Sequence, residues 1–415
     1  MSELGRVLRV EARRTALLIA VPLLTAVGVV TAWLSLVPGV AYWDNTVVAL
    51  VNSVRVLGPL AAGLTAWAAV RERRLDYLRD LTSRAPATGA LVDMALLSAA
   101  ALLAYGTVTA VVAVDTLLRE QAGAAQPMGI LAGATALVMH VVIGYLAGRL
   151  VPRPATAVVV LAGTWLWAAA RGTSTSWWSL LPPAALNEVE LFTGLRPWVL
   201  AAEVSWSAGL TVTLVLAYVW WVNRRPWTIV PLLAAVSLTA LATLGLESSD
   251  GRAVSPVPTA PSCREWPLTI CVHPALRGAL PALMTATTPL AARLNGTPGA
   301  FTRIEQRPGT APAGVSKGVA GVHLDDLSPG YEAQVVRQIR DGLVDRRACA
   351  GQRRRAAAEY RAMIDAWLLG TEQPDVSDPW AARAFGGWTE QQRRAWLRAN
   401  FAAYHRCALT ARAFR

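Results

Sequence analysis

Seven long stretches of this sequence contain almost no charged residues, and they constrain the fold more than any other feature. A hydrocarbon core of about 30 Å needs about 20 apolar residues at 1.5 Å per residue. Only 16% of the 415 residues are charged, against about 25% in soluble domains. We therefore predict an all-α polytopic membrane protein with about seven transmembrane helices, approximately at residues 15–37, 46–70, 91–114, 128–148, 155–171, 198–222 and 227–246.

Along the sequence, loops that contain many arginines alternate with loops that contain few. The net charge of +12 comes almost wholly from arginine, since Lys317 is the only lysine. Short basic clusters beside apolar runs favour orientation in a lipid bilayer over binding of nucleic acid. We therefore expect a multi-pass protein of the cell membrane with its N-terminus in the cytoplasm. An odd number of spans then places the C-terminal domain outside the cytoplasm. The arginine-rich loops contain Arg6, Arg9, Arg13, Arg14, Arg71, Arg73, Arg74, Arg79, Arg84, Arg149, Arg153, Arg224 and Arg225.

The loop at residues 71–90 combines these charges with leucines at helical spacing. Residues 1–14 have a similar pattern, and both are typical of short amphipathic helices on the cytoplasmic surface. The carboxylates Glu72, Asp76 and Asp80 share one helical face. That face either meets a partner protein or pairs with the arginines three and four residues away.

This layout resembles the membrane subunits of ATP-binding-cassette exporters of the type-2 permease family. That family has an amphipathic N-terminal helix, six spans, a charged coupling helix between the second and third, and short extracellular helices between the fifth and sixth. Residues 1–225 contain these parts in that order, and Arg71-Glu72-Arg73-Arg74 through Leu81-Thr82-Ser83-Arg84 looks like the coupling segment.

The resemblance implies a permease subunit that forms a homodimer or heterodimer and works with a separate ATPase. The residues that it assigns to ATPase coupling are Arg71, Glu72, Arg74, Asp76, Arg79 and Asp80. A seventh span and a large C-terminal domain depart from the six-span pattern. The alternative is a non-transporting membrane module, a sensor or an assembly factor, that displays an extracytoplasmic binding domain.

The chain accordingly divides into four expected parts. These are a cytoplasmic amphipathic helix at 1–14, a permease-like membrane domain at 15–225, a seventh transmembrane helix at 226–246 and an extracytoplasmic domain at 247–415.

Motifs of several enzyme classes are missing from the sequence. It contains no G-x-x-x-x-G-K-[ST] loop, so any ATP hydrolysis that drives transport must occur in another chain. It also contains neither His-Glu-x-x-His nor G-x-S-x-G. We expect a transport subunit that is not itself an enzyme and that needs no cofactor.

Two ionisable residues within the predicted spans are candidates for a conduit or its gate. Arg55 lies about nine residues into the second span, where an uncompensated arginine is costly. Glu203, in the sixth span, is its candidate partner, and a purely structural ion pair would explain both. The loop at 172–197 contains Trp177 and Trp178 and is too apolar for a solvated connection, so we expect a re-entrant or interfacial pair of short helices there.

All four cysteines lie in the C-terminal domain. An even number on the oxidising side predicts two disulfides. Zinc binding with His273 and His405 is the alternative, but the usual Cys-x₂₋₄-Cys knuckles are missing, and we expect no metal. The cysteines are Cys263, Cys271, Cys349 and Cys407.

Two expected helices select one of the three disulfide pairings. One helix covers 347–370, and Thr389 with Gln392 forms a capping box that opens another. If these helices fold back on each other, Cys349 and Cys407 can meet, which leaves Cys263 to pair with Cys271.

The rest of the domain is expected to be mainly helical with minor β content. We predict a helix near 274–294, a strand at 300–306 and a helix opened by Ser328-Pro329.

Overall fold

The structure is a computed structural model of the chain, and it forms two compact units. The membrane unit extends to Val257. The second unit comprises Pro258–Arg415, together with two short earlier segments that include Gly39 and Glu190–Phe192. The described residues are 17–37, 39–72, 86–119, 122–172, 176–345, 348 and 355–415.

Apolar helices account for most of the membrane unit. They coincide closely with the predicted spans, because runs of this length have no alternative way to satisfy their backbone in lipid. The helices are α2 (Leu17–Leu34), α3 (Trp43–Glu72), α5 (Pro86–Leu118), α6 (Pro127–Leu150), α7 (Pro154–Ala170), α8 (Pro197–Asn223) and α9 (Ile229–Glu247). Short elements are the 3₁₀ helices η2 (Trp177–Leu180) and η3 (Pro226–Thr228) and the strands β1 (Thr193–Leu195) and β2 (Val254–Pro256).

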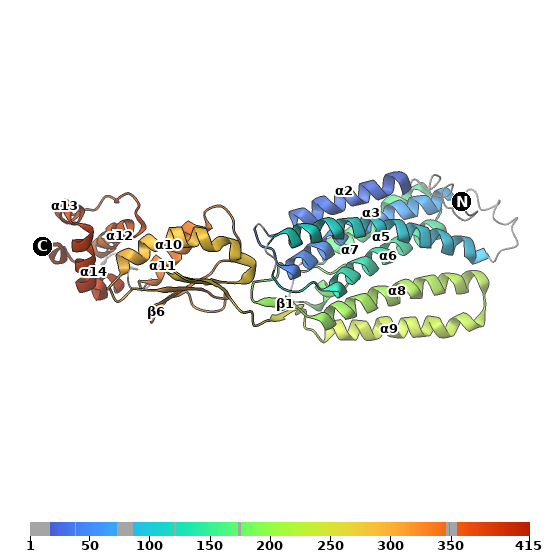
Figure 1. Cartoon of the computed structure of the whole chain (residues 1–415). Coiled ribbons are helices and arrows are strands. Elements are labelled where there is room, and N and C mark those ends of the chain that lie inside the picture. Colours follow the sequence, from blue (N-terminus) through green and yellow to red (C-terminus); the bar gives the residue numbers. More distant parts are fainter. Residues whose placement is uncertain are drawn as a thin grey trace. The chain divides into compact units, whose positions relative to one another are not determined.

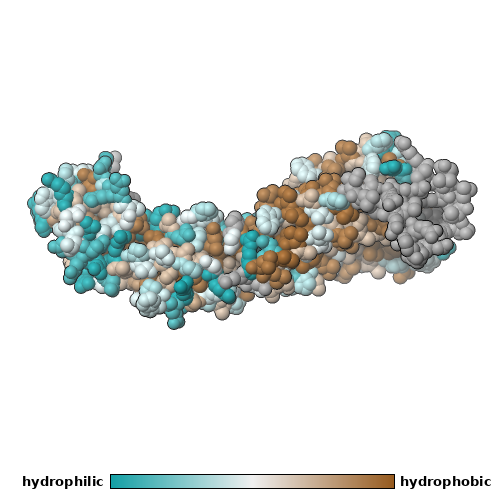
Figure 2. Space-filling view, turned by 45° about the horizontal axis from the view of Figure 1, so that its top comes forward, coloured by the Kyte–Doolittle hydropathy of each residue, from teal (hydrophilic) through white to brown (hydrophobic). Residues whose placement is uncertain are grey.

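Five of these helices are long and apolar enough to cross a membrane, which indicates a membrane protein. The five are α3, α5, α6, α8 and α9, whereas α2 and α7 are shorter apolar helices. Large apolar side chains on α7 and α9 are exposed, among them Val158 and Val230. Figure 2 shows hydrophobic residues gathered over the membrane unit and hydrophilic residues over much of the second unit.

Proline fixes where several helices begin. Pro127, Pro154 and Pro197 each occupy the first turn, where the missing N–H has no helical partner to lose. The α8–α9 connection is tight because Arg224 adopts a left-handed conformation with φ of 50° and its N–H donates to Trp220 O. The sequence therefore sets both the starts of these helices and this reversal.

The central helix of the unit is α3, which contacts α2, α5, α6 and α7 (Figure 1). At one end of the bundle α3 stops at Glu72, and the residues from there to Pro86 connect it to α5. We call this the basic-loop end. At the opposite end, Tyr42 bridges Ala122, and β1 pairs antiparallel with β2.

The second unit contains a mixed five-stranded sheet. Its order is β3-β4-β5-β7-β6; β5 is parallel to β4 and β7, and the two edge strands are antiparallel. The predicted strand at 300–306 is present as β5, but the other four were not predicted. The strands are β3 (Ser262–Arg264), β4 (Thr269–Val272), β5 (Arg303–Gln306), β6 (Gly314–Ser316) and β7 (Val319–Val322).

Helices make up the remainder of the second unit. The two helices predicted from residues 274–294 and Ser328-Pro329 are present, and the capping box of Thr389 and Gln392 opens α14. The helices are η4 (Pro274–Ala279), α10 (Leu280–Leu294), α11 (Tyr331–Gly342), α12 (Arg355–Leu369), α13 (Pro379–Gly387), α14 (Glu390–His405) and η6 (Ala411–Phe414).

One disulfide joins the first two strands of the sheet. Cys263 and Cys271 are direct partners across β3 and β4, with their Cα atoms 4.1 Å apart. Cys407 is also disulfide-bonded. Its predicted partner, Cys349, lies outside the described residues.

Candidate functional site

The predicted coupling segment begins at the end of α3. Arg71 is exposed, and its guanidinium carbon lies 5.6 Å from the centroid of the Trp67 ring. Glu72 is half-buried and is the last described residue before the segment. The other predicted coupling residues lie outside the described residues: Arg74, Asp76, Arg79 and Asp80.

Buried and half-buried polar side chains from four helices meet at this basic-loop end. Tyr145 Oη, on α6, donates to Asp93 Oδ2 on α5 at 2.9 Å, and both residues are buried. Arg149 Nε donates to Tyr218 Oη on α8 at 3.3 Å. The charges of Glu72 and Arg149 both act on Tyr145, which adds α3 to the group. We call these five residues the basic-end cluster.

The basic-end cluster lies at the attachment points of the predicted coupling segment. The segment leaves α3 at Glu72 and enters α5 seven residues before Asp93. A displacement of the segment would therefore act on hydrogen bonds that join α5 to α6 and α6 to α8. The sequence pattern did not predict this cluster, although Asp93 and Arg149 stand at the edges of predicted spans.

Close packing of α3 against α6 makes the core rigid beside the cluster. A Cβ atom on Gly144 would lie 2.1 Å from Ala62 O, and one on Gly148 would lie 2.4 Å from Ala66 O. These glycines therefore let the two backbones touch, as small residues four apart do in other membrane helix pairs. Thr65 Oγ1 also donates to Val141 O at 3.1 Å.

Arg55 lies in the half of α3 that is farther from the basic-loop end, where it binds the carboxyl end of α7. Its Nη2 donates to Ala168 O at 2.8 Å and to Arg171 O at 2.9 Å. The last carbonyls of a helix have no partner within the helix and carry its negative dipole end, so they attract a guanidinium. The predicted pairing of Arg55 with Glu203 is therefore wrong.

Arg171 is the second arginine at this place and is only 5% exposed. Its Nε donates to Trp167 O at 3.0 Å, and its Nη1 donates to Leu181 O. The guanidinium carbon lies 4.4 Å from the centroid of the Trp167 ring. We call Arg55 and Arg171 the arginine pair. Its two charges are close enough to repel each other.

The loop that follows α7 is folded onto the start of α3. Trp177 and Trp178 lie in η2, with ring centroids 5.2 Å apart, and Trp178 is 52% exposed. Asn52 Nδ2 donates to Leu186 O at 3.1 Å, and Asn45 Oδ1 accepts from the N–H of Val189 at 2.8 Å.

The predicted pair of short helices in this loop is wrong. Among its described residues there is one 3₁₀ turn, followed by irregular chain that is buried up to residue 186, and then by the strand β1. Two successive prolines, Pro182 and Pro183, follow η2 and remove the N–H groups that would extend a helix.

Glu203 is elsewhere in the membrane unit, 1% exposed on α8. Its Oε1, like Ser207 Oγ one turn later, has no hydrogen-bond partner within the described part of the chain. Burying a carboxyl without a partner is energetically costly.

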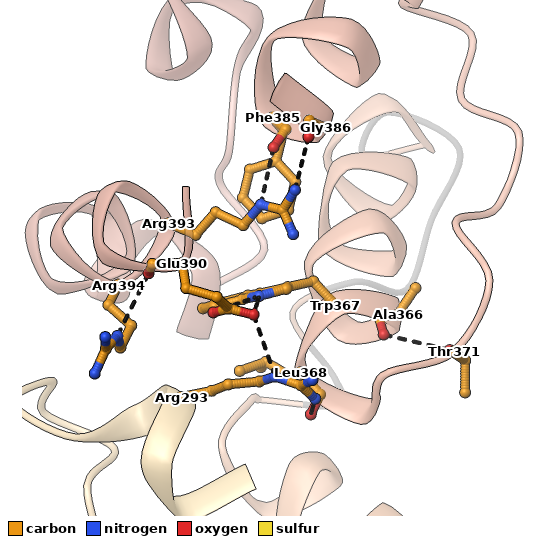
Figure 3. A network of polar contacts seen from close by, with 10 residues as sticks. All are labelled: Arg293, Ala366, Trp367, Leu368, Thr371, Phe385, Gly386, Glu390, Arg393 and Arg394. Carbon is orange, nitrogen blue, oxygen red and sulfur yellow. Dashed lines mark hydrogen bonds and ion pairs between the residues drawn. The ribbon is translucent and has the colours of Figure 1, made fainter. Parts of the chain in front are cut away.

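In the second unit, arginines are paired with carboxylates. Figure 3 shows Glu390 between Trp367 and Arg293: Trp367 Nε1 donates to Glu390 Oε1 at 3.2 Å, and Arg293 Nε lies 3.8 Å from the same oxygen. In the same view Arg393 donates to the carbonyls of Phe385 and Gly386 at the end of α13.

The most buried of these carboxylates is Asp365 on α12. Arg340 Nη1 lies 2.9 Å and Arg361 Nε 3.4 Å from Asp365 Oδ2, and Tyr404 Oη donates to Oδ1 at 2.6 Å. Burial raises the pKa of the Tyr404 phenol well above 10, so the hydroxyl keeps its proton and remains a donor.

His273 occupies a second buried position, at the start of η4. Its Nδ1 accepts from the N–H of Ala275 at 3.2 Å, and its backbone N–H donates to Gln306 Oε1 at 2.6 Å. Burial lowers the pKa of the imidazole from 6.5 to about 4. Within the described ranges, no group of three or more His, Cys, Asp or Glu side chains could hold a metal ion.

Comparisons of the chain with protein-family models, with curated proteins and with solved structures found no match.

Proposed function

We propose that this chain is the membrane-spanning subunit of an ABC exporter, which dimerises and recruits a separate ATPase. In this proposal all seven apolar helices cross the membrane. The basic-loop end faces the cytoplasm and the second unit lies outside. The 17 residues of α7 would extend about 26 Å at 1.5 Å per residue, which is at the short limit for a span.

The observation that carries the proposal is the basic-end cluster beside the charged loop. The loop joins two helices that each contribute a carboxylate, Glu72 and Asp93, to a partly buried polar group shared with α6 and α8. An ATPase that docks on the loop and changes shape would pull on this group. The hydrogen bond from Tyr145 to Asp93 would then carry the movement from α5 into α6.

Rigid contact between α3 and α6 supports the same mechanism. Because backbones touch at Gly144 and Gly148, movement at the basic-loop end cannot be absorbed by side-chain rearrangement there. It would be transmitted along α3 toward Arg55, in the other half of the helix.

Co-purification tests the proposal. The full-length protein should recover a second protein that contains a phosphate-binding loop and hydrolyses ATP. Reversing Asp76 and Asp80 together (D76R/D80R) should reduce its recovery about tenfold or more, since close charge pairs across an interface contribute about 1.5 kcal/mol or more.

Asp115→Arg provides the matched control. Asp115 is also an acidic residue with an arginine four positions later, Arg119, but it lies at the opposite end of the bundle. Its reversal should leave recovery unchanged. Absence of an ATPase from the preparation, or equal recovery with D76R/D80R and the parent protein, would contradict the proposal.

A further inference from the structure

We propose that the arginine pair binds a phosphate group. Neither Arg55 nor Arg171 forms an ion pair with any carboxylate in the described part of the chain; their acceptors there are backbone carbonyls. Two cations therefore lie next to each other in a membrane protein without an opposite charge from the described chain.

The carbonyls at the end of α7 compensate only part of this charge. A helix C-terminus is equivalent to about half an elementary negative charge, whereas the pair carries two positive charges. The Trp167 ring under Arg171 adds a cation–π attraction. An arginine within a membrane helix is energetically costly unless it is paired. The remaining positive charge thus favours an anion.

Each guanidinium also has a nitrogen whose N–H has no hydrogen-bond acceptor within the described part of the chain. Arg55 Nε and Arg171 Nη2 are buried, and neither has a hydrogen-bond acceptor among the residues that the structure describes. Arg171 as a whole is 95% buried, since it is 5% exposed. Buried donors without acceptors are uncommon because each has lost the hydrogen bond that water would have provided. An oxygen-rich anion would accept from both.

The chemistry of the pair suits a phosphate group. Guanidinium groups are planar forks that match two phosphate oxygens, and they are less strongly hydrated than ammonium groups. Arg55 lies twelve residues after Trp43, about 18 Å along α3 at 1.5 Å per residue. The loop that supplies Leu181 O to Arg171 also contains the half-exposed Trp178, and tryptophans of this kind lie at the level of lipid headgroups.

Two sources can supply this phosphate: the headgroup of an anionic lipid, or a phosphate-bearing solute. If the bound phosphate belongs to the transported substrate, the substrate is a phosphate-containing compound, and this part rests on the proposed function. The binding of phosphate itself rests on the arginine pair alone.

The test uses the full-length protein in micelles of an alkyl maltoside, a detergent that contains no phosphate. One arm is titrated with inorganic phosphate; the other receives phosphatidylglycerol and no free phosphate. Binding is measured as the rise in unfolding temperature and by ³¹P NMR. Stabilisation in the first arm identifies a solute phosphate, and stabilisation in the second alone identifies a lipid headgroup.

The variants Arg55→Gln and Arg171→Gln should each weaken binding about tenfold or more, the effect of losing one charge-assisted hydrogen bond. Arg119→Gln is the matched control: it removes an exposed arginine at the same end of the bundle, already paired with Asp115. It should bind like the parent protein. Arg55→Lys, which keeps the cation, serves if a glutamine variant does not fold, and it should also bind more weakly because the fork is lost.

No stabilisation in either arm would overturn the inference, as would equal loss of binding in Arg119→Gln. The outcome is separate from that of the co-purification experiment. Phosphate binding without an associated ATPase would retain the arginine pair as a site and reject the exporter, and an ATPase without phosphate binding would do the reverse.

Discussion

In the second unit Arg340 and Arg361 point at the buried carboxylate of Asp365, whereas in the membrane unit Arg55 and Arg171 contact backbone carbonyls. The same side chain therefore has different surroundings in the two units. Where a carboxylate is supplied by the chain, the arginine is part of the fold. Where the chain supplies only the carbonyls at a helix end, part of the positive charge of the arginines is not compensated and can bind an anionic ligand.

The two units also differ in how their elements approach each other. In the membrane unit, glycines bring α3 and α6 into backbone contact. In the second unit, aromatic rings fill the space between α12, α13, α14 and η6, as in the contacts of Phe385 with Trp367, Trp396 and Phe414. Lipid provides no hydrophobic force between helices, so close backbone packing takes its place.

The largest effect is expected from removing the carboxylate that compensates the arginines of the second unit. Asp365→Asn leaves Arg340 and Arg361 charged and largely buried, which should lower the free energy of unfolding of this unit by about 3–5 kcal/mol. Urea unfolding of the full-length protein in nanodiscs, followed by tryptophan fluorescence, measures it.

Asp341→Asn is the matched control for this change. Asp341 contacts the same Arg340 at 2.9 Å but its side chain is 32% exposed. Its removal should lower the free energy of unfolding by about 1 kcal/mol or less. Equal effects of the two substitutions would mean that burial of Asp365 is not what makes the difference between the units.

Acid should destabilise the second unit through His273. The folded unit keeps this imidazole neutral down to about pH 4, but the unfolded chain takes up the proton below about 6.5. Its contribution is therefore complete above pH 6.5 and is lost as the pH falls toward 4, by about 1.4 kcal/mol per pH unit and up to about 3 kcal/mol in total.

The difference in unfolding free energy between the parent protein and His273→Asn, measured from pH 7.5 to 4, isolates this effect. Asparagine can retain the acceptor for the N–H of Ala275 but does not titrate. The pH dependence should be shallower in the variant by the amount given above. An identical dependence in both proteins would exclude His273 as its source.

A smaller effect is expected where helices of the membrane unit touch. Gly144→Ala places a methyl group against the carbonyl of Ala62 and should destabilise the unit by about 1–3 kcal/mol. Gly163→Ala, on α7, has no atom within 4 Å of its new Cβ and should change little. Thermal unfolding in detergent compares the two variants. Equal unfolding temperatures would show that close backbone contact is not what holds α3 to α6.

The sequence predicted the elements of the membrane unit well, because the length of an apolar run fixes a helix almost independently of its neighbours. The predicted span at 198–222 corresponds to α8, Pro197–Asn223, and that at 128–148 to α6, Pro127–Leu150. The strands of the second unit contain three or four residues each, which is too short for an alternating pattern to be recognised.

The candidate site was predicted only in part. Arg55 was identified because a charged side chain within a span is energetically costly. Its partners are backbone carbonyls more than a hundred residues later, and a sequence cannot single these out because every residue has a carbonyl. Arg171 was not among the predicted site residues, because its burial depends on the chain that follows η2, where Leu181 O accepts from its guanidinium. Tertiary packing, not local pattern, brings these groups together.

Topology mapping tests the central claim most directly, namely that the membrane unit separates a cytoplasmic basic loop from an external second unit. Alkaline phosphatase, which is active only outside the cytoplasm, and a fluorescent protein that folds only inside would each be fused after Glu72 and after Arg415. We predict fluorescence without phosphatase activity at Glu72 and phosphatase activity without fluorescence at Arg415. The same reporter active at both positions would contradict the account.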